Sequence, residues 1–167
     1  MSGEKYKKVV IYTDGACTGN PGPGGYGVIL KYGKRRKELS AGYRQTTNNR
    51  MELMAAIVGL EALKSPCRVT LYTDSKYLVD SLTKGWARRW REKRWMRNKK
   101  EKALNPDLWE KLLDLCDYHR VEIKWVKGHA GDPENERADF LATRAAQQEN
   151  LLVDKNYLKE SGQLKLT

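Results

Sequence analysis

Two apolar, β-branched runs in this chain end in the same three residues. The run that begins at Val9 reaches Tyr-Thr-Asp at Asp14, and the run that begins at Val69 reaches it again at Asp74. An ionised carboxylate at the edge of a core costs on the order of several kcal/mol unless something positive meets it. If the two strands are parallel neighbours, Asp14 and Asp74 lie at the same carboxyl-terminal edge of the sheet, where a cationic group would compensate them.

The hydrophobic period of the whole chain predicts an α/β fold. Strands are expected over residues 5–13, 26–32, 37–43, 68–73 and 121–126, and helices over 51–63, 75–82, 105–118 and 132–147. The Gly- and Pro-rich residues 15–25 are expected to form a loop. Three antiparallel strands followed by two parallel strands make a mixed five-stranded sheet, flanked by about five helices once a short helix in the basic segment is counted.

Length and composition favour one domain. The chain has 167 residues, of which 40% are apolar, so residues 1–150 are expected to form a single domain, followed by a loosely ordered tail over 151–167. The N-terminus lacks the features of a secretory signal, which predicts a cytoplasmic protein. Three cysteines without Cys-x-x-Cys spacing predict reduced thiols and no thiolate zinc site. No apolar surface stripe is evident, so a monomer is expected.

The net charge of +11 is concentrated in one segment. Between Lys84 and Lys102 there are ten lysines and arginines but only two glutamates, an excess of eight positive charges. Such a concentration is typical of a surface that binds phosphates. The segment therefore indicates a nucleic acid as the partner.

Two further acids are expected on inward helix faces. Glu52 shares a face with small and apolar residues, and so does Asp139. Each acid has a simpler explanation: Asp14 and Asp74 as turn caps, Glu52 as an acid favoured by the helix dipole, and Asp139 as the partner of an arginine. Four acids that face one edge of a sheet are better explained by a shared ligand, namely divalent Mg²⁺ or Mn²⁺.

Four sequence blocks together resemble bacterial ribonuclease HI over almost the full length of the chain. The blocks are YTDGACTGNPGPGGYG (12–27), TTNNRMELMAA (46–56), YTDSKY (72–77) and VKGHAGDPENERAD (126–139). The resemblance implies a ribonuclease H-like fold and a magnesium-dependent endonuclease that hydrolyses the RNA strand of RNA–DNA hybrids, leaving 5′-phosphate and 3′-hydroxyl ends. It also implies the metal ligands, which are Asp14, Glu52, Asp74 and Asp139.

The chemistry of this family fits the acidic residues. Two Mg²⁺ ions roughly 3.5–4 Å apart can bind one phosphate, activating the attacking water and stabilising the leaving oxygen. Asp14 is expected to bridge both ions, and Mn²⁺ is expected to substitute for Mg²⁺. His129 looks like the family's mobile histidine, suited to proton transfer or product departure, although a surface loop histidine is the simpler interpretation without the resemblance. His119 matches no motif.

The resemblance also implies contacts with the hybrid. Near the cut these are Cys17, Asn20, Asn48 and Asn49, and on the DNA-strand phosphate they are Thr47 and Asn105. Either Arg44 or Gln45 is expected to support that phosphate pocket. The glycine-rich segment lacks the G-x-G-x-x-G spacing before a helix, which argues against a dinucleotide and against any organic cofactor.

The basic segment carries three interleaved tryptophans, Trp86, Trp90 and Trp95. Part of this pattern is explained by the packing of a short helix. In the family the region is a protrusion that holds the DNA strand, which assigns substrate contacts to Trp86, Arg88, Arg89, Arg91 and Arg94. The alternatives are a recombinase- or transposase-type nuclease and a non-catalytic hybrid-binding module on the same fold.

Overall fold

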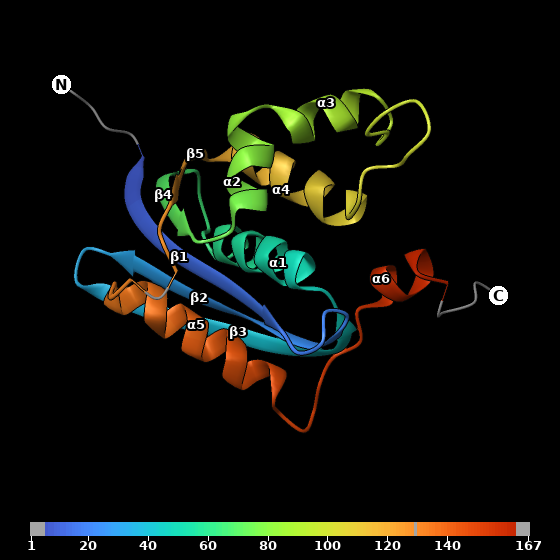
Figure 1. Cartoon of the computed structure of the whole chain (residues 1–167). Coiled ribbons are helices and arrows are strands. Elements are labelled where there is room, and N and C mark those ends of the chain that lie inside the picture. The colour runs from blue at the N-terminus through green and yellow to red at the C-terminus, as the bar shows by residue number, and fades with distance from the viewer. Residues whose placement is uncertain (1–5, 129, 163–167) are drawn as a thin grey trace.

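The five strands form one sheet in the order β3-β2-β1-β4-β5 (Figure 1). A computed structural model describes residues 6–128 and 130–162 of the chain. The strands are β1 (Lys7–Cys17), β2 (Gly22–Tyr32), β3 (Arg35–Thr46), β4 (Cys67–Thr73) and β5 (Arg120–Trp125). The first three pair antiparallel, whereas β4 pairs parallel with β1 and β5 pairs parallel with β4. The predicted mixed sheet is confirmed.

Six helices lie within the described residues, and four of them begin after a residue whose side chain caps the first turn. They are α1 (Asn48–Glu61), α2 (Lys76–Thr83), α3 (Trp86–Glu92), α4 (Pro106–Tyr118), α5 (Pro133–Ala146) and α6 (Lys155–Glu160). The side chains of Thr47, Ser75 and Asp132 accept hydrogen bonds from backbone N–H groups in the first turns of α1, α2 and α5. Within the described ranges, no helix combines the length and the apolar character that crossing a membrane requires.

Helices cover both faces of the sheet. Helix α1 packs on one face, with α2, α3 and α4 on the same side, and α5 packs on the other face (Figure 1). Gly59 brings α1 close to β1 and β2, because a Cβ there would lie 3.0 Å from Ile11 and 3.1 Å from Val28. The core is therefore formed where the long central strands meet α1.

The segment 15–25 is mostly strand, so the predicted loop is wrong. Strand β1 continues to Cys17 and β2 begins at Gly22, which leaves a connection of four residues. A Cβ on Gly25 would lie 2.5 Å from the carbonyl oxygen of Ala142 in α5. The glycines allow close packing between the sheet and α5. Glycine is also common in loops, so the local sequence does not distinguish a closely packed strand from a loop.

Residues 151–162 also differ from the prediction, because this part of the tail is docked. Leu152 donates its backbone N–H to Gly42 and accepts one from Arg44, both at 2.8 Å. Asp154 is 5% exposed and accepts a hydrogen bond of 2.7 Å from Arg50 Nε. Helix α6 follows. The partner of Asp154 lies 104 residues earlier in the chain, so periodicity within the tail could not reveal this contact.

Candidate active site

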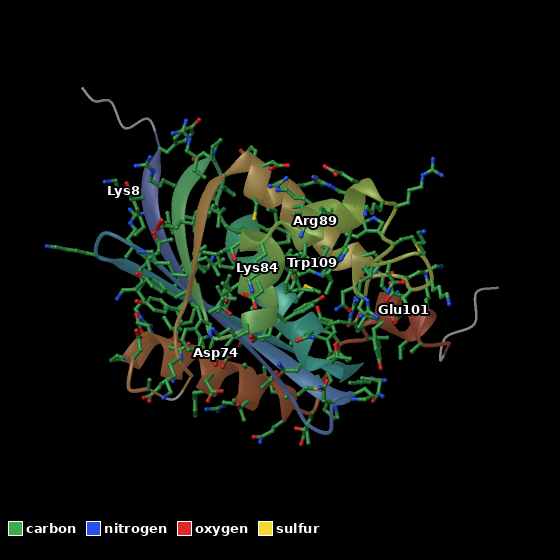
Figure 2. All side chains as sticks on the ribbon, turned by 45° about the horizontal axis from the view of Figure 1, so that its top comes forward. Lys8, Asp74, Lys84, Arg89, Glu101 and Trp109 are labelled. Atoms are coloured by element: carbon green, nitrogen blue, oxygen red, sulfur yellow. The ribbon has the colours of Figure 1, made fainter. Side chains whose placement is uncertain are left out.

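Asp14 and Asp74 follow two neighbouring parallel strands. Tyr12 of β1 lies opposite Tyr72 of β4, and their rings stack with centroids 4.9 Å apart. Because these strands run in the same direction and in register, the aspartates two residues further on lie at the same edge of the sheet; Figure 2 labels Asp74 there. The convergence expected for two parallel neighbouring strands is confirmed.

Glu52 reaches the same edge from α1, because Gly15 lets the helix come close. A Cβ on Gly15 would lie 2.5 Å from the backbone nitrogen of Glu52. The Gly15 N–H donates to Glu52 Oε1 and to Asp14 Oδ1. Glu52 is 3% exposed and lies in the second turn of α1. The simpler explanation, an acid in the first turn that the helix dipole stabilises, therefore does not apply to Glu52. Carboxylate oxygens of Asp14, Glu52 and Asp74 lie within 4.8 Å of one another.

Asp139 of α5 lines the same open cleft, which has a volume of about 510 Å³. The buried alanines Ala138 and Ala142 hold α5 against the sheet and so bring Asp139 to the cleft. Among the described residues no arginine or lysine forms a salt bridge with Asp139, so the simpler explanation of an ion pair does not apply. The structure brings together all four predicted carboxylates.

The carboxylates of the cleft repel one another when they are ionised. Burial, followed by the negative charges of Glu52 and Asp74, raises the pKa of Asp14 well above its ordinary value, with a smaller contribution from Asp139. Burial, followed by the charge of Asp74, also raises the pKa of Glu52. Both side chains therefore hold protons more tightly than free carboxylic acids do. A cation in the cleft would relieve this repulsion, and its binding would release those protons.

The donor set fits a hard divalent cation. All the clustered ligand atoms are carboxylate oxygens, which Mg²⁺ and Mn²⁺ prefer. Cys17 also lines the cleft, but its thiol lies 3.5 Å from the carbonyl oxygens of Gly22 and Thr46, to which it can donate. The pKa of Cys17 is raised, chiefly by burial. A protonated thiol is a poor metal ligand, so among the described residues the carboxylates are the ligands that the geometry offers.

The predicted contact residues near the cut surround the acidic cleft. Asn48 and Asn49 line it directly from the first turn of α1. Asn20 is exposed in the connection between β1 and β2, and its side-chain oxygen accepts the backbone N–H of Asn48 at 2.9 Å. This hydrogen bond joins the turn to the helix start. Asn20 is thereby held next to a residue that lines the cleft, and it lines the neighbouring depression itself.

Thr47 and Asn105 meet in a neighbouring depression. Both line it together with Asn20 and Asn49, and α6 contributes Tyr157 to the lining. The side chain of Asn105 is held by the buried Arg50 network, since its oxygen accepts from Arg50 Nη1 at 3.3 Å. Neither Arg44 nor Gln45 lines this depression, which leaves their role as a prediction.

The basic segment forms α3 and an irregular loop with an apolar groove of about 460 Å³ beside it. Trp86, 37% exposed, and Trp90 both line the groove, and Trp90 also packs edge-on against buried Trp109. Helix α3 ends at Glu92, so Trp95 lies beyond it and the packing of this short helix accounts only for Trp86 and Trp90. Figure 2 shows Arg89 and Glu101 in this region, away from Asp74.

The four predicted arginines divide into two pairs. Arg88 and Arg91 form ion pairs with carboxylates of α4, at 2.7 Å to Asp117 and 3.0 Å to Asp114. Among the residues that the structure describes, Arg89 and Arg94 have no such acidic partner, and Arg89 lines the groove. The charges of the second pair are therefore more available to a phosphate backbone.

A model of the RNase H family matches residues 6–147 of this chain. The chain belongs to the ribonuclease H family. A ribonuclease H of Desulforamulus reducens is 67% identical over 148 residues, which cover 89% of this chain and 93% of that protein. The resemblance seen in the four sequence blocks is thus confirmed.

Two solved structures are similar in fold. LC9-RNase H1, a type 1 RNase H with the type 2 active-site motif, has a TM-score of 0.77 and 32% identity, with 99% of this chain and 89% of that chain covered. LC11-RNase H1, solved in complex with an RNA/DNA hybrid, has a TM-score of 0.64 and 26% identity, with 83% and 96% covered. The predicted ribonuclease H-like fold is confirmed.

Two further residues bear on this ribonuclease H site. His129 lies outside the described residues, so its role stays a prediction. Sequence reasoning missed Lys76, which lines the acidic cleft beside Asp74. The available signal was its place two residues after that aspartate, in the first turn of a predicted helix.

Proposed function

We propose that this protein is an endonuclease that hydrolyses the RNA strand of RNA–DNA hybrids, leaving 5′-phosphate and 3′-hydroxyl ends. One observation carries the proposal: three carboxylates within 4.8 Å, with Asp139 lining the same cleft, lie together on a strongly basic protein. Membership of the ribonuclease H family and the hybrid-bound relative of the same fold support the choice of substrate.

The four carboxylates are proposed to hold two Mg²⁺ ions, with Asp14 shared between them and Mn²⁺ as a substitute. Bound ions would make a water molecule more acidic and neutralise charge on the scissile phosphate. The protein fixes the ligand oxygens in advance: Asp14 and Asp74 through paired strands, and Glu52 through the Gly15 N–H. Little reorganisation is then needed when ions and substrate arrive.

The RNA strand is proposed to be recognised through its 2′-hydroxyl groups in the minor groove of the hybrid. Asn20, Asn48 and Asn49 offer amide donors and acceptors at the rim of the cleft, and Cys17 lines the same cleft as the carboxylates. Thr47 and Asn105 would bind a phosphate of the DNA strand in the adjoining depression. These two sites share Asn49, so both strands of one duplex can be held together.

The basic segment is proposed to extend this grip on the DNA strand. Trp86 presents a partly exposed ring beside the groove, suited to packing against a sugar. Arg88, Arg89, Arg91 and Arg94 add positive charge along α3 and the loop that follows. Their contribution should depend strongly on salt, because phosphate binding releases counterions.

The same proposal includes further properties of the chain. His129, which follows β5 in the sequence, would move a proton or assist product departure. We propose that residues 1–150 act as a single domain, that the protein is a cytoplasmic monomer, and that it needs no organic cofactor.

The decisive experiment offers three labelled substrates with Mg²⁺: an RNA–DNA hybrid, double-stranded RNA and double-stranded DNA. Internal cuts in the RNA strand of the hybrid alone, with 5′-phosphate ends, are expected. Cleavage of duplex DNA in place of the hybrid would favour a recombinase- or transposase-type nuclease. Hybrid binding without any cleavage would favour a non-catalytic module.

A further inference from the structure

The acidic cleft contains one basic side chain among the described residues that line it, Lys76. It is exposed, it is the first residue of α2, and it follows Asp74 by two positions. The four carboxylates of this cleft would repel the phosphates of a hybrid. Only bound cations and this ammonium group would attract them. The location of Lys76 therefore requires an explanation.

The stability of α2 does not explain it. The amino end of a helix carries partial positive charge, so a lysine there is unfavourable by roughly 0.3–1 kcal/mol. In the part of the chain that the structure describes, no carboxylate lies within 4.0 Å of Lys76 Nζ, although Asp14, Glu52 and Asp74 are close by in the same cleft. The ammonium group thus remains uncompensated beside the cluster that would attract it.

Trp125 at the end of β5 accounts for this arrangement. Lys76 Nζ lies over its ring, 4.1 Å from the centroid. The indole N–H donates to the backbone oxygen of Asp74 at 3.2 Å, which ties the ring to the segment that carries the carboxylate. The ring is 43% exposed, so its core packing is limited. A neutral aromatic face holds a cation without neutralising its charge.

We propose that Lys76 binds a backbone phosphate of the RNA strand next to the phosphate that is cut, and that Trp125 positions the ammonium group for this contact. The inference rests on the proposed function. The RNA strand is the one whose phosphate must lie over the carboxylates, so its neighbouring phosphates are the anions nearest to Lys76. Lysine is a suitable point-charge partner for such a phosphate.

The first test compares Lys76→Gln with Lys34→Gln, a matched removal of an exposed lysine in the turn at the opposite end of the sheet. Lys76→Gln should raise KM about two- to fivefold, the size expected for an exposed ion pair. It should also reduce the slope of log(kcat/KM) against log[salt] by about 0.9, the value expected when one phosphate is no longer neutralised. Lys76→Arg should restore both values, and Lys34→Gln should change neither.

A second test asks whether Trp125 acts through Lys76. Trp125→Leu should raise KM about twofold in the native background and have no further effect on Lys76→Gln, because the two residues form one unit. Trp125→Phe keeps an aromatic face and should be intermediate. Additive losses would show that Trp125 supports the site independently and would overturn its positioning role.

Two further results would overturn the assignment of Lys76. An unchanged salt slope in Lys76→Gln, with only the Mg²⁺ midpoint altered, would mean that the lysine tunes the acidic cluster and touches no phosphate. Disappearance of the Lys76→Gln effect on hybrids with one neutral methylphosphonate in the DNA strand would place the contact on the wrong strand. If the native protein fails to cut the hybrid at all, the proposed function fails first, and that outcome is distinguishable from both.

Discussion

Helix α1 carries two buried ionisable side chains, two residues apart, of which one has oppositely charged partners and the other does not. Arg50 is 1% exposed and forms ion pairs of 2.7 Å with Asp107 and of 2.7 Å with Asp154. Glu52 is 3% exposed and faces two further carboxylates without a compensating cation among the described residues. One helix turn thus joins a saturated network, in which every charged group has an oppositely charged partner, to an unsaturated cluster, in which the carboxylates have none.

The difference separates stability from function. The network around Arg50 joins α1, α4 and the C-terminal segment, and each charge in it is matched by hydrogen bonds. Its charged groups are already occupied by one another. The cluster around Glu52 is held together against repulsion, which the fold tolerates because strand pairing fixes Asp14 and Asp74. Buried charge that lacks a partner indicates a site for a ligand.

The largest effect is expected from removing one charge of the unsaturated cluster. Asp74→Asn should lower turnover of the hybrid by about 10³-fold or more, since it weakens cation binding where charge develops in the transition state. The Kd for the hybrid should change little, because most affinity comes from the basic surface. Gel-shift and cleavage assays under the same salt conditions measure the two quantities. Retained turnover would remove Asp74 from the proposed metal ligands.

The saturated network should respond in stability. Arg50→Met leaves Asp154 and Asp107 without their cation and should lower the free energy of unfolding by about 3–5 kcal/mol in urea titrations. Asp14→Asn, in metal-free protein, should be neutral or stabilising because it relieves repulsion. Arg36→Gln, an exposed arginine paired with Glu134, is the matched control and should cost about 1 kcal/mol or less. Equal losses for all three variants would abolish the contrast.

The same contrast should recur, more weakly, along α3. Arg89→Gln with Arg94→Gln should raise KM and reduce the salt slope by about 0.9 for each phosphate that the variant no longer binds. Arg88→Gln with Arg91→Gln should reduce the slope less, because their partners Asp117 and Asp114 already occupy them, and should destabilise α3 slightly. Steady-state kinetics at several salt concentrations distinguish the pairs. Identical slopes for both double variants would mean that the ion pairs with α4 open on binding.

The smallest effect concerns pH, and the two clusters should act with opposite sign. Burial raises the pKa of Asp14, so the folded protein holds a proton that the unfolded chain loses near pH 4; this stabilisation decreases as pH rises. The advantage of Asp14→Asn in unfolding free energy should therefore grow between pH 4 and pH 8 in metal-free protein. An advantage that is constant over this range would contradict the raised pKa.

For Asp107, burial favours the neutral acid, but hydrogen bonds and the charge of Arg50 outweigh it and lower the pKa. Its stabilising contribution is complete above the ordinary value of about 3.8 and is lost as pH falls through the lower folded value. Asp107→Asn should accordingly have its greatest cost above that value. Urea titrations at pH 3 and pH 6 check this sign.

Local sequence was enough to predict most of the fold and the four carboxylates. The strands follow from continuous apolar runs and, over residues 121–126, from a period of two, and the starts of α2 and α5 follow from Ser75 and Asp132. Placing Asp14 and Asp74 together required the assumption that their strands are parallel neighbours, a pairing that the family resemblance supplied. Glu52 was identified by its helical face, although α1 begins earlier than predicted.

What the sequence alone determined was each element and the chemistry that it carries, because hydrogen bonding and hydrophobic period act within a few residues. The tertiary structure decided the partners across long distances: Asp154 with Arg50, Gly25 with α5, and Lys76 with Trp125. Whether a charge is matched or left available depends on the elements that pack around it. That packing separated the structural arginine from the acids of the proposed active site.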